Sequence, residues 1–239
     1  MPAAICPSRL WIVVPAAGQG ARMGAELPKQ YLPLNGKTLL DSTLGRLLQI
    51  PELAGVVVAL ADNDRHWAAS IYADDDRITT VTGGAERAES VRCALTHLLS
   101  QATAADWVMV HDAARPCIRP QALLDLLGAA EQHQGAILAR QVSETVKSVV
   151  NGVIDHTVDR QLLWTAQTPQ LFRVGDLHQW LSSLLKAGIA VTDEASAAEH
   201  HGVKPAVIKG PVDNIKITHP EDLAFAEMIL AQQAKEGIV

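Results

Sequence analysis

The stretch that decides the fold of this chain runs from Leu10 to Lys29 and reads LWIVVPAAGQGARMGAELPK. Its beginning, 10–14, is apolar without alternation, as expected of a strand covered on both faces. Small residues and glycines follow at once, so backbone N–H groups can come close to a phosphate chain. Arg22 and Lys29 add two cations to the same loop. The pattern favours a nucleoside triphosphate site; a plain glycine-rich turn with two solvated cations is the alternative.

Two familiar phosphate-binding motifs do not fit this region. The dinucleotide fingerprint G-x-G-x-x-G requires a glycine where Met23 stands, and Pro28 falls where its helix would run. The P-loop pattern is matched at its end by Gly36-Lys37-Thr38, but its first glycine would be Tyr31. The sequence therefore indicates a phosphate loop of another type, which ends in a Pro-Lys step.

Composition limits the class of protein. At 239 residues, 48% of them hydrophobic, the chain is long enough for one large α/β domain with a sizeable core. The net charge of −6 argues against a general binder of nucleic acids or membrane surfaces. Cys6, Cys93 and Cys117 are odd in number and widely spaced, which favours neither a disulfide framework nor a zinc site. Neither a signal-peptide pattern nor a bilayer-spanning apolar run occurs, so we expect a cytoplasmic protein.

Strand patterns and helical patterns alternate along most of the chain. This alternation predicts an α/β fold with a Rossmann-like, doubly wound, mostly parallel sheet. Thr218-x-x-Glu221 reads as a capping box for the final helix. The expected strands are 10–14, 56–60, 78–81, 107–110, 136–139 and 206–208, and the expected helices are 39–49, 91–99, 121–132, one marked by leucines within 177–185, a short one opened by 192–196, and the final one.

A β-hairpin interrupts this alternation. Two runs rich in β-branched residues, 145–150 and 153–158, are joined by Asn151-Gly152, which is the strongest local signal for a two-residue hairpin. An isolated hairpin is marginal in water, so this one must pack on something. We hypothesise that it is a dimerisation arm that packs on a second subunit.

Two further loops follow expected strands and carry polar residues. His111-Asp112-Ala113-Ala114-Arg115-Pro116 comes directly after the strand 107–110. Ligands of open α/β sheets bind beyond the carboxyl ends of strands, and a carboxylate there can hold Mg²⁺ against phosphate oxygens. A turn or capping aspartate is the alternative for Asp112. The second loop, 83–90, reads as a base-recognition loop or as a tight connection in which Ser90 caps a helix.

Four segments together resemble one family. The chain is similar to the nucleotidylyltransferases and, among them, to the 2-C-methyl-D-erythritol 4-phosphate cytidylyltransferase family of the non-mevalonate isoprenoid pathway. The resemblance runs from about Trp11 to the final helix, and its segments occur in the expected order. They are Pro15-Ala16-Ala17-Gly18-x-Gly20-x-Arg22-Met23 with Pro28-Lys29-Gln30-Tyr31, Gly83-Gly84-x-x-Arg87-x-x-Ser90, the hexapeptide 111–116, and Asp213-Asn214-Ile215-Lys216.

This resemblance implies an enzyme that joins CTP to 2-C-methyl-D-erythritol 4-phosphate and releases pyrophosphate, with Mg²⁺ as the cofactor. It implies a single nucleotidylyltransferase domain over 1–239, with the β-arm inserted at about 142–168. It also implies a homodimer formed through that arm, with no nucleic-acid or membrane partner.

Individual roles follow from the same resemblance. The family usually has an acidic residue where this chain has Ala85, so the resemblance implies a nucleobase contact through the backbone of Ala85 and not through an acidic side chain. Thr145 and Arg160 would be donated to the neighbouring subunit's site; a strand threonine and a solvated arginine are the alternatives. The implied catalytic residues are Arg22, Lys29, Arg160 and Lys216; the nucleotide-binding residues are Ala16, Ala17, Gly18, Gly20, Gly84, Ala85, Arg87, Ser90 and Asp112, the last also for the metal; the substrate-binding residues are Arg115, Thr145, Arg160, Thr192, Asp213 and Lys216.

Three other functions stay open. A related transferase could use another polyol phosphate, such as ribitol 5-phosphate. A nicotinamide oxidoreductase is a different class, against which Met23 and Pro28 count. A non-catalytic nucleotide-binding module would bind CTP without releasing pyrophosphate.

Overall fold

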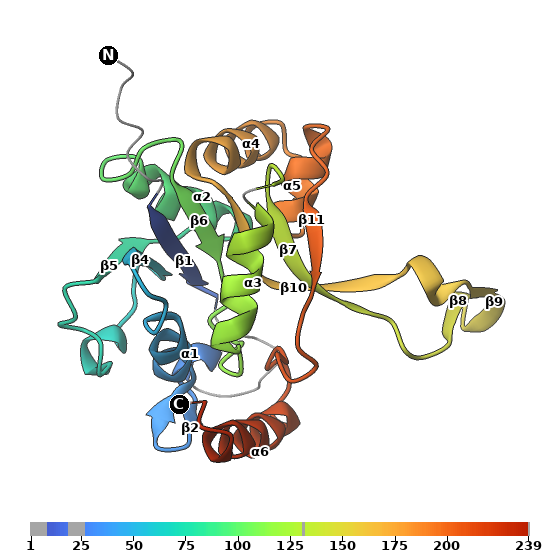
Figure 1. Cartoon of the computed structure of the whole chain (residues 1–239), viewed down its shortest axis with the longest axis horizontal. Helices are drawn as coiled ribbons and strands as arrows, with labels where there is room; N and C mark the ends of the chain where they lie inside the picture. Colours follow the sequence, from blue (N-terminus) through green and yellow to red (C-terminus); the bar gives the residue numbers. More distant parts are fainter. Residues whose placement is uncertain (1–8, 19–26, 131, 239) are drawn as a thin grey trace.

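The computed structural model describes residues 9–18, 27–130 and 132–238. Its centre is a seven-stranded sheet in the order β11-β7-β10-β6-β1-β4-β5 (Figure 1). The strands of this sheet are β1 Leu10–Ala16, β4 Leu53–Leu60, β5 Ile78–Thr82, β6 Trp107–Val110, β7 Ala136–Gln141, β10 Trp164–Arg173 and β11 Ala206–Lys209.

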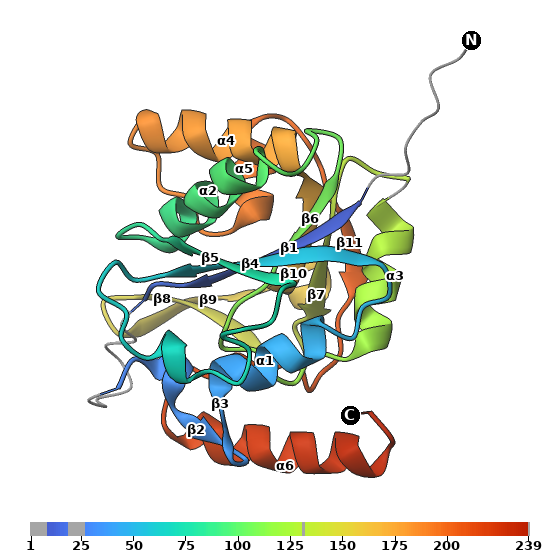
Figure 2. The same cartoon turned by 90° about the vertical axis from the view of Figure 1, so that its left-hand side faces the viewer.

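Helices cover both faces of this sheet, as the doubly wound prediction requires. In Figure 2, α2, α4 and α5 lie on one face and α1 and α3 on the other, with α6 beyond α1. The helices are α1 Leu39–Leu47, α2 Arg87–Leu98, α3 Pro120–Ala130, α4 Val174–Lys186, α5 Glu194–His200 and α6 Glu221–Lys235, with short 3-10 turns η2 Lys29–Tyr31, η3 Trp67–Ala69 and η4 Arg160–Leu162.

Strand β1 divides the core into two layers. Ile12 and Val14 pack in the cluster that includes α1 and α3, whereas Trp11 and Val13 pack in the cluster that includes α2 and α4. Side chains of a strand alternate between the two faces of its sheet, so a strand buried on both faces must be apolar throughout. The continuous apolar run at 10–14 is therefore explained by its central place between β4 and β6.

The predicted hairpin is present and projects from the body of the molecule (Figure 1). Strands β8 Val146–Val150 and β9 Val153–Val158 pair antiparallel with each other and form a sheet of their own. Asn151 and Gly152 both have positive φ, 52° and 80°, as a type I′ turn demands. A second small ribbon, β2 Pro33–Leu34 and β3 Lys37–Thr38, precedes α1.

Strand β10 carries the chain from the arm back into the main sheet. It lies between β6 and β7 and runs antiparallel to both, whereas the other neighbouring pairs are parallel. The sheet is thus mostly parallel, as expected, with one antiparallel strand near its middle. No described helix is long and apolar enough to cross a membrane.

The predicted cap of the final helix is wrong, and so is the cap considered as the alternative role of Ser90. Helix α2 begins at Arg87, so Ser90 lies inside the helix, where it is buried, and does not cap it. At α6 the side chain of Thr218 does not cap the helix; its hydroxyl and its backbone N–H both donate to Asp222 Oδ2, at 3.0 and 2.7 Å. In both places a side chain further along the chain satisfies the turn, which the residue spacing alone does not reveal.

Candidate active site

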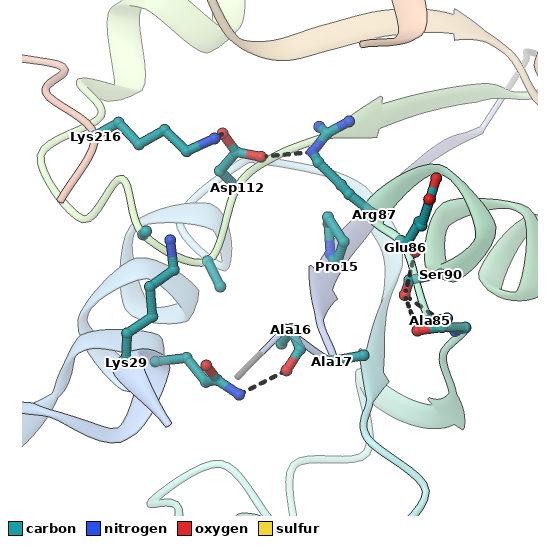
Figure 3. A pocket seen from close by; sticks show the side chains of 15 residues that line it. Pro15, Ala16, Ala17, Lys29, Ala85, Glu86, Arg87, Ser90, Asp112 and Lys216 are labelled. Atoms are coloured by element: carbon teal, nitrogen blue, oxygen red, sulfur yellow. Dashed lines mark hydrogen bonds and ion pairs between the residues drawn. The ribbon is translucent and has the colours of Figure 1, made fainter. Parts of the chain in front are cut away.

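A pocket of about 140 Å³ lies beyond the carboxyl ends of β1, β5 and β6 (Figure 3). This is the edge of the sheet where open α/β folds bind ligands. The pocket is lined by four parts of the chain: the start of the glycine loop with η2, the 84–90 segment, the loop after β6, and Lys216. The lining residues are Pro15, Ala16, Ala17, Gly18, Lys29, Gln30, Gly84, Ala85, Glu86, Arg87, Ser90, Asp112, Ala113, Ala114 and Lys216.

The glycine loop leaves β1 directly into the pocket. Its first residues have small side chains or none, so their backbone forms part of the pocket wall. Gln30, which is buried, fixes the position where the chain leaves β1, because its Nε2 donates to the carbonyl of Ala16 at 2.7 Å. Lys29 lies beside Gln30, and its side chain points into the pocket (Figure 3). The predicted residues Gly20 and Arg22 lie outside the described residues.

The 84–90 segment forms a second wall. The N–H of Gly84 donates to Ser90 Oγ at 3.1 Å, and the N–H of Ala85 donates to Glu89 Oε2 at 2.8 Å. A Cβ on Gly84 would lie 2.2 Å from Glu89 Cγ, so the Glu89 side chain would have to move away from this segment if position 84 were not glycine. Glu89 thus brings a carboxylate to the backbone of Ala85.

Asp112 is the centre of a cluster of charges. Its carboxylate accepts a hydrogen bond from Arg87 Nε at 2.9 Å and lies 2.8 Å from Lys216 Nζ and 3.5 Å from Arg115 Nε. Burial alone would raise the pKa of this carboxyl, but the charges of Arg87, Lys216 and Arg115 outweigh it and hold the pKa far below its usual range. Asp112 is therefore ionised at any physiological pH.

A further carboxylate, which the sequence interpretation treated only as part of a helix start, completes this cluster. Glu194 is 1% exposed, and both of its oxygens accept from Arg87, at 2.7 Å from Nη1 and 3.1 Å from Nη2. Burial raises the pKa of Glu194, while the Arg87 guanidinium acts in the opposite direction. Arg87 therefore binds two carboxylates at once, with its fork on Glu194 and its Nε on Asp112.

The loop that carries Asp112 rests on a neutral histidine. His111 is fully buried, and its Nε2 lies 3.0 Å from the carbonyl of Arg115, which can only accept. Its Nδ1 lies 3.1 Å from Thr168 Oγ1; that oxygen accepts from the N–H of Asp112 at 3.0 Å, and its hydroxyl hydrogen can be donated to Nδ1. This arrangement fits the neutral tautomer with hydrogen on Nε2. Burial lowers the pKa of His111 to about 4.

Several predicted site residues do not line the pocket of their own chain. Arg115 braces the loop, since its Nη1 donates to the carbonyl of Asn214 at 2.8 Å. Asp213 pairs with Arg119 at 2.6 Å and lines a separate groove of about 640 Å³. Thr192 is exposed at the entry to α5. Thr145 and Arg160 belong to the projecting arm segment, where Arg160 Nη1 donates to the carbonyl of Ser143.

The described residues contain no group of three or more His, Cys, Asp or Glu side chains that could hold a metal ion by themselves. A divalent cation here would take Asp112 as its protein ligand and most of its oxygens from elsewhere. Mg²⁺ in nucleotide sites is commonly held in this way, by one or two carboxylates together with substrate phosphates. The residues present are compatible with that arrangement.

Comparison with known proteins identifies the family. The model of the family described as 2-C-methyl-D-erythritol 4-phosphate cytidylyltransferase matches residues 10–232. The chain belongs to this family. Curated 2-C-methyl-D-erythritol 4-phosphate cytidylyltransferases of Pseudomonas fluorescens and Vibrio atlanticus are 51% and 48% identical to it over 90% and 92% of this chain and 93% and 94% of theirs. The crystal structure of the Francisella tularensis enzyme superposes with a TM-score of 0.81 at 38% identity, over 93% of this chain and 100% of that one.

Membership of the cytidylyltransferase family confirms the resemblance inferred from the four sequence segments and the predicted fold class. It also excludes the nicotinamide oxidoreductase considered above. For this family member, the structure brings four separate parts of the described chain together in the pocket, although they are separated by up to about 200 residues in the sequence. The individual residue roles remain predictions.

Proposed function

We propose that this protein transfers the cytidylyl group of CTP to 2-C-methyl-D-erythritol 4-phosphate, giving 4-diphosphocytidyl-2-C-methyl-D-erythritol and pyrophosphate. One observation supports this most strongly. In a member of this family, the glycine loop, the 84–90 segment, Lys29, Asp112 and Lys216 converge on one pocket at the carboxyl edge of the sheet. Both substrates are anions. Although the chain as a whole is negatively charged, the pocket contains positively charged side chains that can bind them.

The reaction requires no protein nucleophile. An oxygen of the polyol phosphate attacks the α-phosphorus of CTP and forms a new P–O bond. The bond from that phosphorus to the bridging oxygen of the β-phosphate breaks, and its electron pair leaves with pyrophosphate. Because the attacking phosphate is already ionised at neutral pH, no general base is needed. Catalysis then consists of positioning and charge stabilisation.

The residues divide this task between them. Lys29, together with the predicted Arg22, would stabilise charge on the α-phosphate and the departing pyrophosphate. The backbone of Gly84 and Ala85 would meet the base, with Ser90 and Glu89 fixing those two amides. Lys216 would hold the attacking phosphate, and its pair with Asp112 at 2.8 Å would orient the ammonium group for that contact.

Mg²⁺ is the cofactor that we propose. When bound, the cation would neutralise triphosphate charge and polarise the phosphorus–oxygen bonds. Asp112 is the carboxylate of this chain that would hold it.

A homodimer formed through the arm completes the proposal. The arm exposes apolar side chains that a monomer would leave in water, and exposed patches of this kind mark interaction surfaces. A partner's arm would also supply the Thr145 and Arg160 that are not in the pocket of their own chain. Five apolar residues of the arm are each more than half exposed: Val149, Val150, Val153, Ile154 and Leu162.

Release of pyrophosphate tests the function. Purified protein with Mg²⁺ is supplied with CTP and 2-C-methyl-D-erythritol 4-phosphate, and in parallel with ribitol 5-phosphate, UTP or ATP. We expect release only with the first pair. Release with ribitol 5-phosphate instead would change the substrate but keep the reaction, and CTP binding without any release would favour a binding module.

A lysine pair provides the matched control for the site. Lys29→Met removes a cation of the pocket, whereas Lys37→Met makes the same change at an exposed position of β3. We expect turnover to fall at least ~100-fold in the first variant, the scale of one preorganised charge contact, and to stay unchanged in the second. Fractionation of cells would check the cytoplasmic location, which we retain as a prediction.

A further inference from the structure

Glu194 is a buried acid for which the proposed reaction has no use. It does not line the pocket, and its side chain is 1% exposed. A buried carboxylate is costly unless it is paired and hydrogen-bonded. Here its partner is Arg87, a residue of the pocket wall, held by both oxygens in a fork.

The position of Glu194 is itself fixed by its neighbours. Asp193 caps α5, since its Oδ1 accepts from the N–H of Ser196 at 2.8 Å. Gln170 of β10, also buried, donates from Nε2 to Asp193 Oδ2 at 2.9 Å and accepts the N–H of Ala195 at 2.8 Å. The residues on both sides of Glu194 are thus tied to the central sheet, so its carboxylate is held at a defined place.

The contacts continue from Glu194 into the site. Arg87 uses Nη1 and Nη2 on Glu194 and Nε on Asp112, and Asp112 binds Lys216 through its other oxygen. Without Glu194, the guanidinium would face the pocket with only one carboxylate near it. It would then be free to turn toward the phosphates of a bound nucleotide, which are the strongest anions available.

We propose that Glu194 is a positioning residue, which holds Arg87 on Asp112 and away from the triphosphate. The proposal rests on the proposed function, because it assigns Arg87 to the alignment of Asp112 and Lys216 in that reaction. In this interpretation Arg87 does not bind the nucleotide; it holds the carboxylates of Glu194 and Asp112 in place.

The proposal has an unusual kinetic signature. Glu194→Gln removes a negative charge beside the pocket and releases part of the Arg87 fork. The KM for CTP should therefore be equal to or lower than that of wild type. At the same time, kcat should fall about 10- to 100-fold, because Asp112 and Lys216 lose their alignment. Loss of structure in α5 would disturb Arg87 in the pocket wall and raise the KM for CTP, so a lower kcat with an unchanged or lower KM separates positioning from a merely structural role.

A double-mutant cycle provides the decisive test. Turnover and the KM for CTP are measured in wild type, Glu194→Gln, Arg87→Met and the double variant, with urea unfolding to establish that each is folded. If Glu194 acts through Arg87, the double variant has the turnover of Arg87→Met within ~2-fold. Glu199→Gln, the same change at an exposed position of α5, should behave as wild type.

Several outcomes would overturn the proposal. They are wild-type turnover in Glu194→Gln, a raised KM for CTP, or single effects that multiply in the double variant. If Glu194→Gln unfolds, the turnover of Arg87→Met and of the double variant can still be compared. The double variant loses both charges of the pair, so neither is left buried without its partner. A failure of the proposed function is seen separately, as wild type that releases no pyrophosphate; direct CTP binding by the four variants then tests Glu194.

Discussion

Replacing Asp112 by asparagine should separate two properties of the site, its affinity for nucleotide and its catalytic power. The Asp112 side chain is 8% exposed and contacts Arg87 at 2.9 Å and Lys216 at 2.8 Å. Asparagine keeps the shape but turns one oxygen into a donor, which must face a cation. The cluster of Arg87, Arg115, Lys216, Asp112 and Glu194, in which the two carboxylates are buried, then changes from one net positive charge to two.

The expected magnitudes follow from this geometry. Breaking a buried ion pair by neutralising one partner costs about 3–5 kcal/mol of unfolding free energy. A domain of ordinary stability, about 5–15 kcal/mol, would be weakened by this loss but would still fold at low temperature. Turnover should fall at least ~100-fold, because the group that aligns Lys216 and would hold the cation has lost its charge. Without metal, CTP should bind at least as tightly as in wild type, since the site is more positive.

Urea unfolding, pyrophosphate release and CTP binding without metal measure the three effects. Asp75→Asn is the matched control, because Asp75 pairs with Arg77 at 2.7 Å at an exposed site, where such a pair contributes at most about 1 kcal/mol. The reasoning would be refuted if Asp112→Asn lost less stability than the control, or kept turnover within ~10-fold of wild type.

Three further predictions concern the arm, a buried histidine and the base-binding segment. If the proposed dimer forms, Ile154→Asp, at a position 59% exposed in this chain, should turn it into a monomer in sedimentation and lower turnover at least ~10-fold. Because the pKa of His111 is about 4 in the folded protein and near 6.5 in the unfolded chain, stability should be lost as pH falls below 6.5, by about 2 kcal/mol at pH 5. Urea unfolding of wild type and His111→Gln at several pH values should show a steeper loss of unfolding free energy with falling pH in wild type. Ser90→Ala leaves the N–H of Gly84 without its 3.1 Å acceptor, and should cost about 1–3 kcal/mol in urea unfolding and raise the KM for CTP.

Features set by local chemistry were predictable from the sequence. The apolar run at 10–14 is a central strand because only such a strand is covered on both faces. Asn151-Gly152 forms the hairpin turn because both residues tolerate positive φ. Motif residues such as Lys29 and Lys216, far apart in the chain, meet in the pocket because they follow or approach the same edge of the sheet.

Features set by contacts between distant segments were not predictable. Nothing in the spacing of Glu194 distinguishes a helix-start acid from the buried partner of Arg87, 107 residues earlier. The same holds for Gln30, whose amide is fixed on the carbonyl of Ala16. Asp213 belongs to the same tetrapeptide as Lys216, yet it turns to Arg119 and away from the pocket. The sequence could have indicated these pairings only if each residue had a single possible partner, or if related sequences had shown the two positions changing together.

The place of β10 in the sheet sets an order for folding. The strands on its two sides, β6 and β7, are made earlier in synthesis, yet neither pairs with the other, and each has an open edge until β10 arrives. A nascent chain ending before Trp164 therefore holds β6 with one open edge and β7 without either of its partners, since β11 also comes later in the chain. Such open edges pair readily with other chains. The interval between synthesis of β7 and insertion of β10 is accordingly when this chain most needs protection from aggregation.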